Sequence, residues 1–373
     1  MTPSKSQLRT AFCGQNVFVT GHTGFKGSWL CEWLLELGAR VSGYSLPPPT
    51  SPALFDQLGL GERLESQLGD VRDLAALHMS MREAEPAFIF HLAAQPLVRL
   101  SYREPVETYA TNLMGTVHLL DAVRRLGLRC VVICVTTDKC YENREWPYGY
   151  REEDPLGGYD PYSSSKAAAE IAIAAYRRSF FATGEPISVA SVRAGNVIGG
   201  GDWALDRIVP DCVRSLEAGT RIGVRNPHST RPWQHVLEPL GGYLTLAASI
   251  AAARAVGDSK TLGRLCSAFN FGPGLAANRE VGALVTEVLR HAEGSWVDHS
   301  DPVAVHEAGR LNLTTDKAFH QLGWYPVWGF ERTVAETMLW YRRPLERSAV
   351  DLTREQIARY LNDAEARATP LNP

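Results

Sequence analysis

A tyrosine and a lysine four residues apart are the residues of this sequence whose types and spacing first suggest proton transfer. In Asp160-Pro161-Tyr162-Ser-Ser-Ser-Lys166 the aspartate is a good N-cap and the proline is a good first helical residue, so Tyr162 and Lys166 are predicted to share one helix face. A nearby ammonium group favours the phenolate and would lower the pKa of Tyr162 from its usual value of about 10. The tyrosine could then act as a general base toward a hydroxyl group. Taken alone, the spacing is more typical of a solvated helix face.

A glycine-rich turn near the start of the chain is typical of a dinucleotide site. The predicted strand Asn16–Thr20 runs directly into Gly21-His-Thr-Gly24-Phe-Lys-Gly27 and then into a predicted helix. Glycines allow a sharp turn and the close approach of a pyrophosphate, which the N–H groups at the helix N-terminus attract. The alternative is a tight turn without a ligand. The residues expected to contact the cofactor here are Gly21, Thr23, Gly24, Phe25, Lys26 and Gly27.

Two further strand ends are expected to contact the same cofactor. Gly69-Asp70-Val71 follows a predicted strand, and Asp70 is placed to accept hydrogen bonds from an adenine. His91-Leu-Ala-Ala-Gln95 ends another strand with small residues, which would let a cofactor lie close over the backbone. The predicted cofactor site therefore also includes Asp70, Val71, Leu92, Ala93, Ala94, Tyr162 and Lys166.

These residues leave the choice between NAD and NADP open. The second strand ends Val41-Ser-Gly-Tyr44-Ser45, without the acidic residue that would hold a ribose 2′-OH. Arg40 and Lys26 are basic residues that could suit a 2′-phosphate.

The elements that must position these residues alternate between short β-branched strands and helices, which predicts a parallel sheet covered on both faces. Beyond about Gly199 the chain is rich in Gly, Pro and Trp, as expected of a smaller lobe over the carboxyl edge, where such sheets bind ligands. The predicted fold is α/β, a Rossmann-type doubly wound parallel sheet with a smaller mixed α/β C-terminal substrate lobe. The predicted strands are Asn16–Thr20, Arg40–Tyr44, Ala87–Leu92, Arg129–Thr136 and Ile187–Arg193, and the predicted helices are Phe25–Leu37, Asp73–Glu85, Pro105–Leu126, Pro161–Phe181, Ala247–Val256, Arg279–His291 and Glu331–Tyr341.

We divide the chain into three parts. Residues 1–198 are expected to form the dinucleotide-binding domain, to which segments around 231–275 return. Residues 199–345 are expected to form the substrate lobe, and 346–373 a peripheral C-terminal tail.

The composition argues against several classes of protein. The 38 Lys and Arg against 41 Asp and Glu leave a net charge of -3, so no strong field attracts nucleic acid or an anionic membrane. The first residues are polar, and no run approaches the roughly 18 to 20 apolar residues of a membrane span. The seven cysteines are odd in number and scattered, which favours free thiols in the cytosol over disulfides or a zinc site. The spacing of His291, His299 and His306 matches no metal motif, so no metal ion is expected.

These residues together resemble the extended short-chain dehydrogenase/reductase family. Within it the sequence is similar to the CDP-glucose 4,6-dehydratases, over a stretch from about Phe12 to Tyr341. The segments that carry the resemblance are GHTGFKGSWL from Gly21, HLAAQPLVRLSY from His91, TTDKCYEN from Thr136, DPYSSSK from Asp160, RAGNVIGGGDW from Arg193 and RPWQHVLEPL from Arg231.

The resemblance implies NAD as the cofactor and CDP-glucose as the substrate of a reaction without net oxidation. Thr137 and Tyr162 would bind the glucose 4-OH, and Tyr162 would remove its proton as the C4 hydride moves to NAD. A base then removes the C5 proton, an acid protonates the departing C6 hydroxyl, and the hydride returns to C6. The resemblance implies Asp138 as this acid and Lys139 as this base.

Two questions about that acid–base pair stay open. Adjacent strand residues point to opposite faces, so Asp138 and Lys139 converge only if the backbone turns at the strand end. Related dTDP-sugar dehydratases carry glutamate at the place of Lys139, and a lysine must be neutral to act as a base. The alternative is that Lys139 is an ion-pair partner and that water or another group is the base.

The substrate nucleotide is expected to need hydrogen-bond donors and positive charge. Arg231 and Asn196 match positions that contact the sugar nucleotide in the family, Arg193 and Arg207 are secondary candidates, and Trp203 or Trp233 could stack on a ring. The choice of cytosine as the base rests on the resemblance alone. The residues predicted to bind substrate are Gln95, Asn196, Arg207, Arg231 and His235.

Two other functions remain as alternatives. One is an NAD-dependent sugar-nucleotide 4-epimerase or reductase, or a dehydratase of another nucleotide sugar, and Thr137-Asp138-Lys139 argues against the epimerase because epimerases need no acid–base pair for elimination. The other is a regulator that binds NAD without catalysis, against which the intact Tyr162 and Lys166 argue. The family also implies a homodimer, or a tetramer, that pairs through Pro105–Leu126 and Pro161–Phe181.

Overall fold

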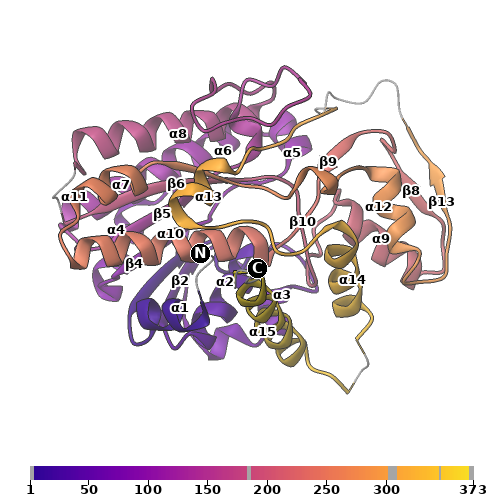
Figure 1. Ribbon diagram of the computed structural model, residues 1–373, viewed down its shortest axis with the longest axis horizontal. Helices are drawn as coiled ribbons and strands as arrows, with labels where there is room; N and C mark the ends of the chain where they lie inside the picture. The colour runs from indigo at the N-terminus through magenta and orange to yellow at the C-terminus, as the bar shows by residue number, and fades with distance from the viewer. Residues whose placement is uncertain (1–3, 183–185, 301–308, 344–345, 369–373) are drawn as a thin grey trace, which may run out of the picture.

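The central sheet is seven-stranded and wholly parallel. The computed structural model describes residues 4–182, 186–300, 309–343 and 346–368, and its main sheet has the order β11-β6-β5-β4-β1-β2-β3 (Figure 1). The chain winds outward from β1 in both directions, which is the doubly wound arrangement and confirms the predicted fold class. The strands are β1 (Asn16–Thr20), β2 (Arg40–Ser45), β3 (Glu65–Leu68), β4 (Phe88–His91), β5 (Val131–Val135), β6 (Ser188–Ala194) and β11 (Ala268–Phe271).

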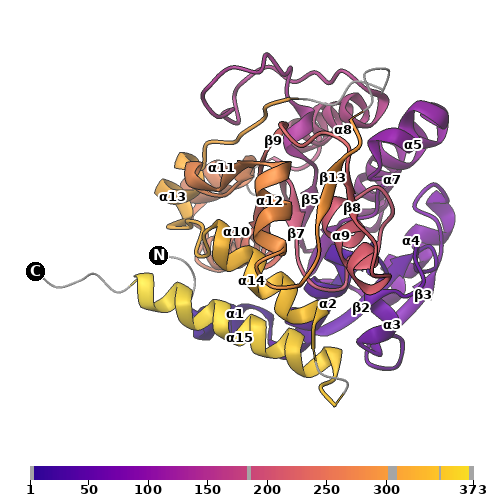
Figure 2. The same ribbon diagram turned by 90° about the vertical axis from the view of Figure 1, so that its right-hand side faces the viewer.

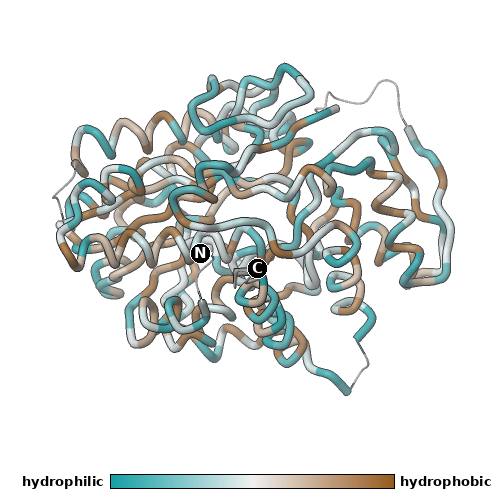
Figure 3. Tube along the Cα trace, viewed as in Figure 1, coloured by the Kyte–Doolittle hydropathy of each residue, from teal (hydrophilic) through white to brown (hydrophobic). Residues whose placement is uncertain are grey.

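Both faces of this sheet are buried because successive strand side chains point to opposite sides. Phe18 and Ile89 pack on one face with α4 (Leu74–Ala84), α7 (Gly115–Leu126) and α8 (Pro161–Ser179). Val17 and Phe90 pack on the other face, which is covered by α1 (Lys5–Phe12), α2 (Phe25–Glu36) and α10 (Leu237–Ala255). Figure 3 shows the apolar stretches along these inner elements and polar stretches along the outer loops.

The start of α8 follows from its N-cap. The Asp160 side chain accepts from the backbone N–H of Ser163, and Pro161 occupies the first helical turn. This places Tyr162 and Lys166 in the first two turns, with both side chains buried. The predicted helix over Pro161–Phe181 is therefore present.

The predicted helix over Pro105–Leu126 is interrupted. It consists of α6 (Pro105–Tyr109), a π-helical turn over Ala110–Met114 and α7. The π turn directs Asn112 inward, where its amide donates to Gln95 O (3.1 Å) and to Ser165 Oγ (2.9 Å). Such turns accommodate one extra residue and often lie beside functional sites.

A smaller lobe lies beyond the carboxyl ends of the strands (Figures 1 and 2). Its own apolar core joins Val209, Ile222, Leu284 and Val334. It contains α9 (Ile208–Glu217), α12 (Val281–Val288), α14 (Phe330–Tyr341) and the paired strands β8 (Ile222–Val224) and β13 (Trp296–Asp298). Short strands β7 (Val197–Ile198), β9 (Thr230–Pro232), β10 (Gln234–His235) and β12 (Asn278–Glu280) connect it to the sheet. The other α-helices of the described ranges are α3 (Leu54–Gln57), α5 (Val98–Arg103), α11 (Ser259–Leu265) and α13 (Asp316–Leu322).

The last described segment is the helix α15 (Ala349–Ala368), which packs on α2. Its Tyr360 lies edge-on to Trp33 of α2, with ring centroids 5.8 Å apart, and the Glu365 carboxylate accepts from the backbone N–H of Lys5 (2.7 Å). Figure 2 shows α15 running alongside α1. The segment expected to be a peripheral tail thus contributes buried side chains to the main core.

Candidate active site

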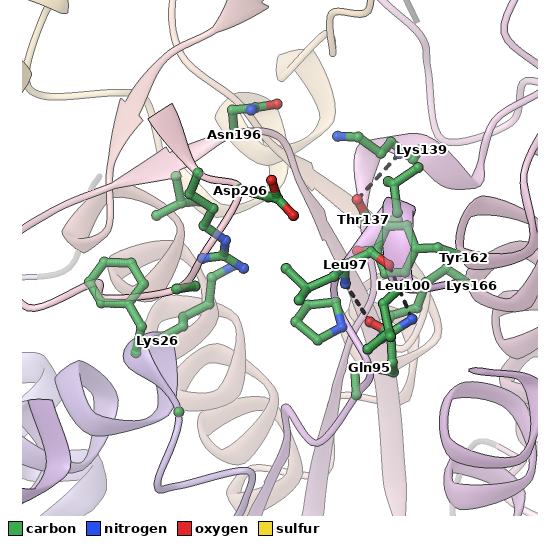
Figure 4. A pocket seen from close by; sticks show the side chains of 18 of the residues that line it. Lys26, Gln95, Leu97, Leu100, Thr137, Lys139, Tyr162, Lys166, Asn196 and Asp206 are labelled. Carbon is green, nitrogen blue, oxygen red and sulfur yellow. Dashed lines mark hydrogen bonds between the residues drawn. The ribbon is translucent and has the colours of Figure 1, made fainter. Parts of the chain in front are cut away.

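A cavity of about 1660 Å³ lies between the carboxyl edge of the sheet and the smaller lobe. Its walls come from the β1–α2 turn, the ends of β2 to β5, the start of α8 and lobe residues between 201 and 233. Figure 4 shows Thr137, Lys139 and Tyr162 on one side of this pocket and Lys26 on the other. The sequence-predicted cofactor and catalytic residues all line it.

The glycine turn has the shape that a pyrophosphate requires. Gly21 has φ 75°, and a Cβ there would lie 2.7 Å from the backbone nitrogen of Ala93. A Cβ on Gly27 would lie 2.1 Å from Gly21 O, so the turn and α2 can pack this closely only without side chains. Gly24, the N-cap of α2, offers no side-chain cap, which leaves the positive helix end for an anion.

The adenine end of the site differs from the sequence-based expectation. Asp70 lines the pocket, but its carboxylate already accepts from Arg72 Nε (2.9 Å), and Arg72 also pairs with Glu107 of α6. The hydrogen bond from Arg72 lowers the pKa of Asp70 below its usual value. An adenine amino group would therefore share Asp70 with Arg72.

Neither basic residue named for a 2′-phosphate lies where one is needed. Arg40 begins β2, opposite Asn16, and donates to the Asn16 side chain (2.7 Å), so it lies at the far end of the strand from the pocket. Lys26 projects from α2 toward Arg207 and Lys166. The pocket residues at and just after the end of β2 are instead uncharged: Ser45, Leu46, Pro47, Pro49 and Thr50.

Tyr162 and Lys166 are buried together, but their electrostatics differ from the prediction. Burial raises the pKa of Tyr162 to about 12, and the hydrogen bond with Thr137 only partly opposes this. Burial also lowers the pKa of Lys166 to about 8, and its ammonium donates to Val135 O (3.1 Å). The expected lowering of the tyrosine pKa is thus wrong, because burial outweighs the Thr137 hydrogen bond and the positive charge of Arg207.

The backbone turns where β5 ends, as convergence of Asp138 and Lys139 requires. A 3₁₀ helix runs over Asp138–Cys140, and the Thr137 hydroxyl caps it. Asp138 is 1% exposed, and its Oδ1 accepts from Thr137 Oγ1 (2.9 Å) and from Lys139 Nζ (3.2 Å). Its Oδ2 is buried and has no hydrogen-bond partner within the described residues. The carboxylate is therefore held by its neighbours on one oxygen, and its other oxygen is buried and unpaired within the described residues.

Four of the residues predicted to bind substrate line the pocket. Asn196 has a buried side-chain oxygen without a partner in the described part of the chain. Arg207 pairs with Asp202 (2.8 Å), and Arg231 donates to Thr230 O (2.9 Å). Gln95 bonds to Leu97 and Thr108, so its amide shapes the turn after β4 rather than pointing freely at a ligand.

The assignment of His235 to substrate binding is wrong. Its side chain is fully buried between Trp29 and Trp328, with ring centroids 5.8 and 4.9 Å away, and it does not line the pocket. Burial lowers its pKa to about 3, so it is a neutral core residue. In the sequence, His235 belongs to the segment RPWQHVLEPL, which carries the family resemblance. Nothing in its spacing reveals that two tryptophans from distant segments cover it.

Arg193 is likewise not a substrate ligand. It is 3% exposed and forms a buried ion pair with Glu170 of α8 (2.9 Å). The two tryptophans named for stacking both line the pocket, but Trp233 is 2% exposed and Trp203 donates to the Gln57 side chain (3.0 Å).

Sequence reasoning missed several charged residues of the pocket, among them a cluster of three. Arg99 and Arg225 both pair with Asp206, whose φ of 63° is unusual for a residue with a side chain. Figure 4 shows the Asp206 carboxylate directed into the pocket. Arg99 lies in the segment from His91 that carries the family resemblance, which is the one signal that could have drawn attention to it.

No cluster of metal-binding side chains occurs among the described residues. His306, considered in the sequence analysis, lies outside them. All seven cysteines are free, and five of them are buried. No helix in the described ranges is long and apolar enough to cross a membrane.

Comparison with known proteins agrees with this architecture. The family model for GDP-mannose 4,6 dehydratase matches residues 18–337. A CDP-glucose 4,6-dehydratase of Salmonella typhimurium is 49% identical over 335 residues, which cover 88% of this chain and 91% of the relative. The chain therefore belongs to this dehydratase family.

Two solved structures share the fold at low identity. The UDP-glucose 4-epimerase of Thermotoga maritima has a TM-score of 0.74 at 20% identity, covering 89% of this chain and all of that one. The dTDP-glucose 4,6-dehydratase of Bacillus anthracis, solved in complex with NAD, has a TM-score of 0.70 at 21% identity, covering 88% and 96%.

Proposed function

We propose that this dehydratase-family member converts CDP-D-glucose to CDP-4-dehydro-6-deoxy-D-glucose. The reaction oxidises C4, eliminates water across C5 and C6 and returns the hydride to C6, so that no net oxidation occurs. The observation that carries the proposal is the Thr137-Asp138-Lys139 turn, which holds a carboxylate and an amine 3.2 Å apart in the same pocket as Tyr162. The 49% identical CDP-glucose 4,6-dehydratase supports the choice of substrate.

The residues of the pocket fit NAD. The Gly21–Gly27 turn and the N-terminus of α2 would hold the pyrophosphate, and uncharged Ser45 and Leu46 near the end of β2 favour NAD over NADP. When bound, NAD supplies a hydride acceptor for C4 and, once reduced, a hydride donor for C6.

Tyr162 is the base for the first half of the reaction. Its hydroxyl shares a hydrogen bond with Thr137, so both can contact the 4-hydroxyl of the sugar. Because burial raises the pKa of Tyr162 to about 12, the tyrosine needs additional positive charge to lose its proton near neutral pH. Lys166 stands one turn further along α8 and donates to Val135 O of β5. Its positive charge is already present, so the additional charge would come with the bound cofactor.

Asp138 and Lys139 act in the second half. A proton passed from the ammonium to the carboxylate across their contact leaves a neutral amine and a carboxylic acid side by side. Lys139 can then remove the C5 proton while Asp138 protonates the departing C6 hydroxyl. In this proposal one proton transfer gives Lys139 the form of a base and Asp138 the form of an acid.

The nucleotide diphosphate would be held by Arg207, Arg231 and Asn196 at the lobe side of the pocket. We propose CDP-glucose as the small-molecule partner, and neither nucleic acid nor a membrane. A cytosolic location suits the seven free cysteines.

We also propose a homodimer that pairs through α6, the π turn and α8. Large apolar side chains are exposed along these helices, among them Val106 (78%), Ile171 (59%) and Met114 (44%). Exposed apolar side chains gathered on adjacent helices are typical of a protein interface.

The test is to incubate the purified protein with CDP-glucose and NAD in deuterated water. The expected product is a 4-keto-6-deoxy sugar with deuterium at C5 and no net formation of NADH. An unchanged sugar, or a sugar inverted at C4, would contradict the proposal.

A further inference from the structure

The buried ion pair between Glu170 and Arg193 forms the centre of a polar network behind the turn of residues 137–140, which we call the catalytic turn. The carboxylate of Glu170, one turn after Lys166 on α8, accepts from Thr136 Oγ1 (2.5 Å), Ser191 Oγ (2.8 Å) and Arg193 Nη2 (2.9 Å). Burial alone would raise the pKa of Glu170, but the charge of Arg193 and these hydrogen bonds keep it below its usual value. The carboxylate is therefore a fixed acceptor that joins α8 to β5 and β6.

The same arginine reaches a second residue beside the turn. Arg193 Nη1 donates to the Tyr141 hydroxyl (2.8 Å), which in turn donates to Asn270 Oδ1 of β11 (2.7 Å). The phenol ring of Tyr141 also stacks on Tyr150, with centroids 5.1 Å apart. Its hydroxyl thus uses both its acceptor and its donor capacity in the core.

The network holds the catalytic turn at both ends. Thr136 comes two residues before Asp138, and Tyr141 follows Cys140, the last residue of the 3₁₀ helix. Both partners of Asp138 Oδ1, Thr137 and Lys139, belong to the turn itself. The direction in which the acid–base pair faces the sugar therefore depends on what fixes the turn as a unit.

We infer that Tyr141, held by Arg193 and Asn270, is a positioning residue for the elimination of water. It acts by setting the orientation of Asp138 and Lys139. Thr137 directly follows Thr136, which Glu170 holds without Tyr141, and Tyr162 stands on α8, whose start is fixed by the Asp160 cap and the Lys166–Val135 bond. This inference rests on the proposed function. It assigns the Tyr141 branch of the network to the second half of the reaction and not to the first.

The Tyr141→Phe variant tests this assignment, because it keeps the stacked ring and removes only the hydroxyl. CDP-6-deoxyglucose reports the first half alone, since it can lose its C4 hydride to added NAD but has no C6 hydroxyl to eliminate. We expect NADH formation from this analogue to stay within about threefold of the unsubstituted protein, while turnover of CDP-glucose falls roughly 10- to 100-fold. Reduced cofactor should then accumulate at 340 nm during turnover of CDP-glucose.

Two further variants make the result decisive. Tyr150→Phe removes a neighbouring tyrosine hydroxyl that bonds to Asn143 and Arg144 outside the network. It should change neither NADH formation from the analogue nor turnover of CDP-glucose. Arg193→Lys keeps a positive charge for Glu170 but shortens the reach to Tyr141. Like Tyr141→Phe, it should lower turnover of CDP-glucose and leave NADH formation from the analogue nearly unchanged. Equal losses in both halves for Tyr141→Phe and Arg193→Lys, or no loss in either, would overturn the inference. Failure of the unsubstituted protein to form any keto sugar would instead reject the proposed function.

Discussion

Lys139 Nζ lies 3.2 Å from Asp138 Oδ1, although adjacent residues of a strand point to opposite faces. The contact exists because the strand β5 ends at Val135 and a 3₁₀ helix begins at Asp138. In the reaction we propose, the two groups would present an acid and a base to neighbouring carbons of a sugar. This relationship is the basis of the first prediction.

Asp138→Asn should block elimination and spare binding. The amide keeps the size of the side chain but cannot supply a proton to the departing hydroxyl, so turnover of CDP-glucose should fall about 10²- to 10⁴-fold. The dissociation constant of CDP-glucose, measured by calorimetry, should change by less than about threefold. Parallel losses in turnover and binding would show that Asp138 holds the substrate instead.

Tyr162→Phe should remove the first half of the reaction. Without the phenol no base takes the proton of the 4-hydroxyl, so NADH formation from CDP-6-deoxyglucose should fall about 10²- to 10⁴-fold. The thermal midpoint should change little, because the ring and its packing on α8 are retained. Near-normal NADH formation in this variant would exclude Tyr162 as the base.

Because of Lys26, the free energy of unfolding should depend on pH between about 7 and 10.5. Burial, with Arg207 and Lys166 nearby, lowers its pKa to about 7 from 10.5. Between these values the unfolded chain binds a proton that the folded protein does not, so this group makes stability rise with pH by up to about 1.4 kcal/mol per pH unit. Below pH 7 both states are protonated and the folded state bears the full cost of burying the charge.

Lys26→Met tests this dependence, since methionine keeps the apolar stem and cannot titrate. The variant should be more stable than the unsubstituted protein at pH 7, and the difference between their free energies of unfolding in urea should shrink toward pH 9.5. A constant difference over this range would show that the lysine does not titrate there.

Charges introduced into the exposed α6–α8 patch should separate the dimer. The double variant Val106→Glu/Ile171→Glu should sediment as a single chain, whereas the unsubstituted protein sediments at twice that mass. Val256→Glu is the matched control, because Val256 is equally exposed (78%) at the end of α10, away from the patch. A monomeric unsubstituted protein would reject the proposed interface.

The main elements could be predicted from local signals. Asp160 and Pro161 place the start of α8, and β-branched runs place β1, β5 and β6 to within about two residues. The turn glycines could be recognised because they lie between a predicted strand and a predicted helix, and the structure leaves no room for a Cβ at Gly21 or Gly27. Family resemblance, rather than spacing, singled out Asp138 and Lys139.

What could not be predicted depends on contacts between distant segments. Arg193 belongs to a motif associated with ligands, yet its charge is neutralised by Glu170 in the core. His235 is enclosed by Trp29 and Trp328, which are more than 200 and 90 residues away in the sequence. Periodicity reports which face of an element is apolar but not which partner covers it, so these residues were assigned to the pocket in error.

β11 makes the sheet depend on residues that come late in the chain. It pairs with the second half of β6, and without it the backbone N–H and C=O groups of residues 191–194 on that side would be unpaired. We therefore expect a fragment that stops near residue 198 to expose an unpaired edge strand and to self-associate, rather than to fold as an independent nucleotide-binding domain. Any exchange of substrate lobes between relatives must accordingly carry a replacement for this seventh strand.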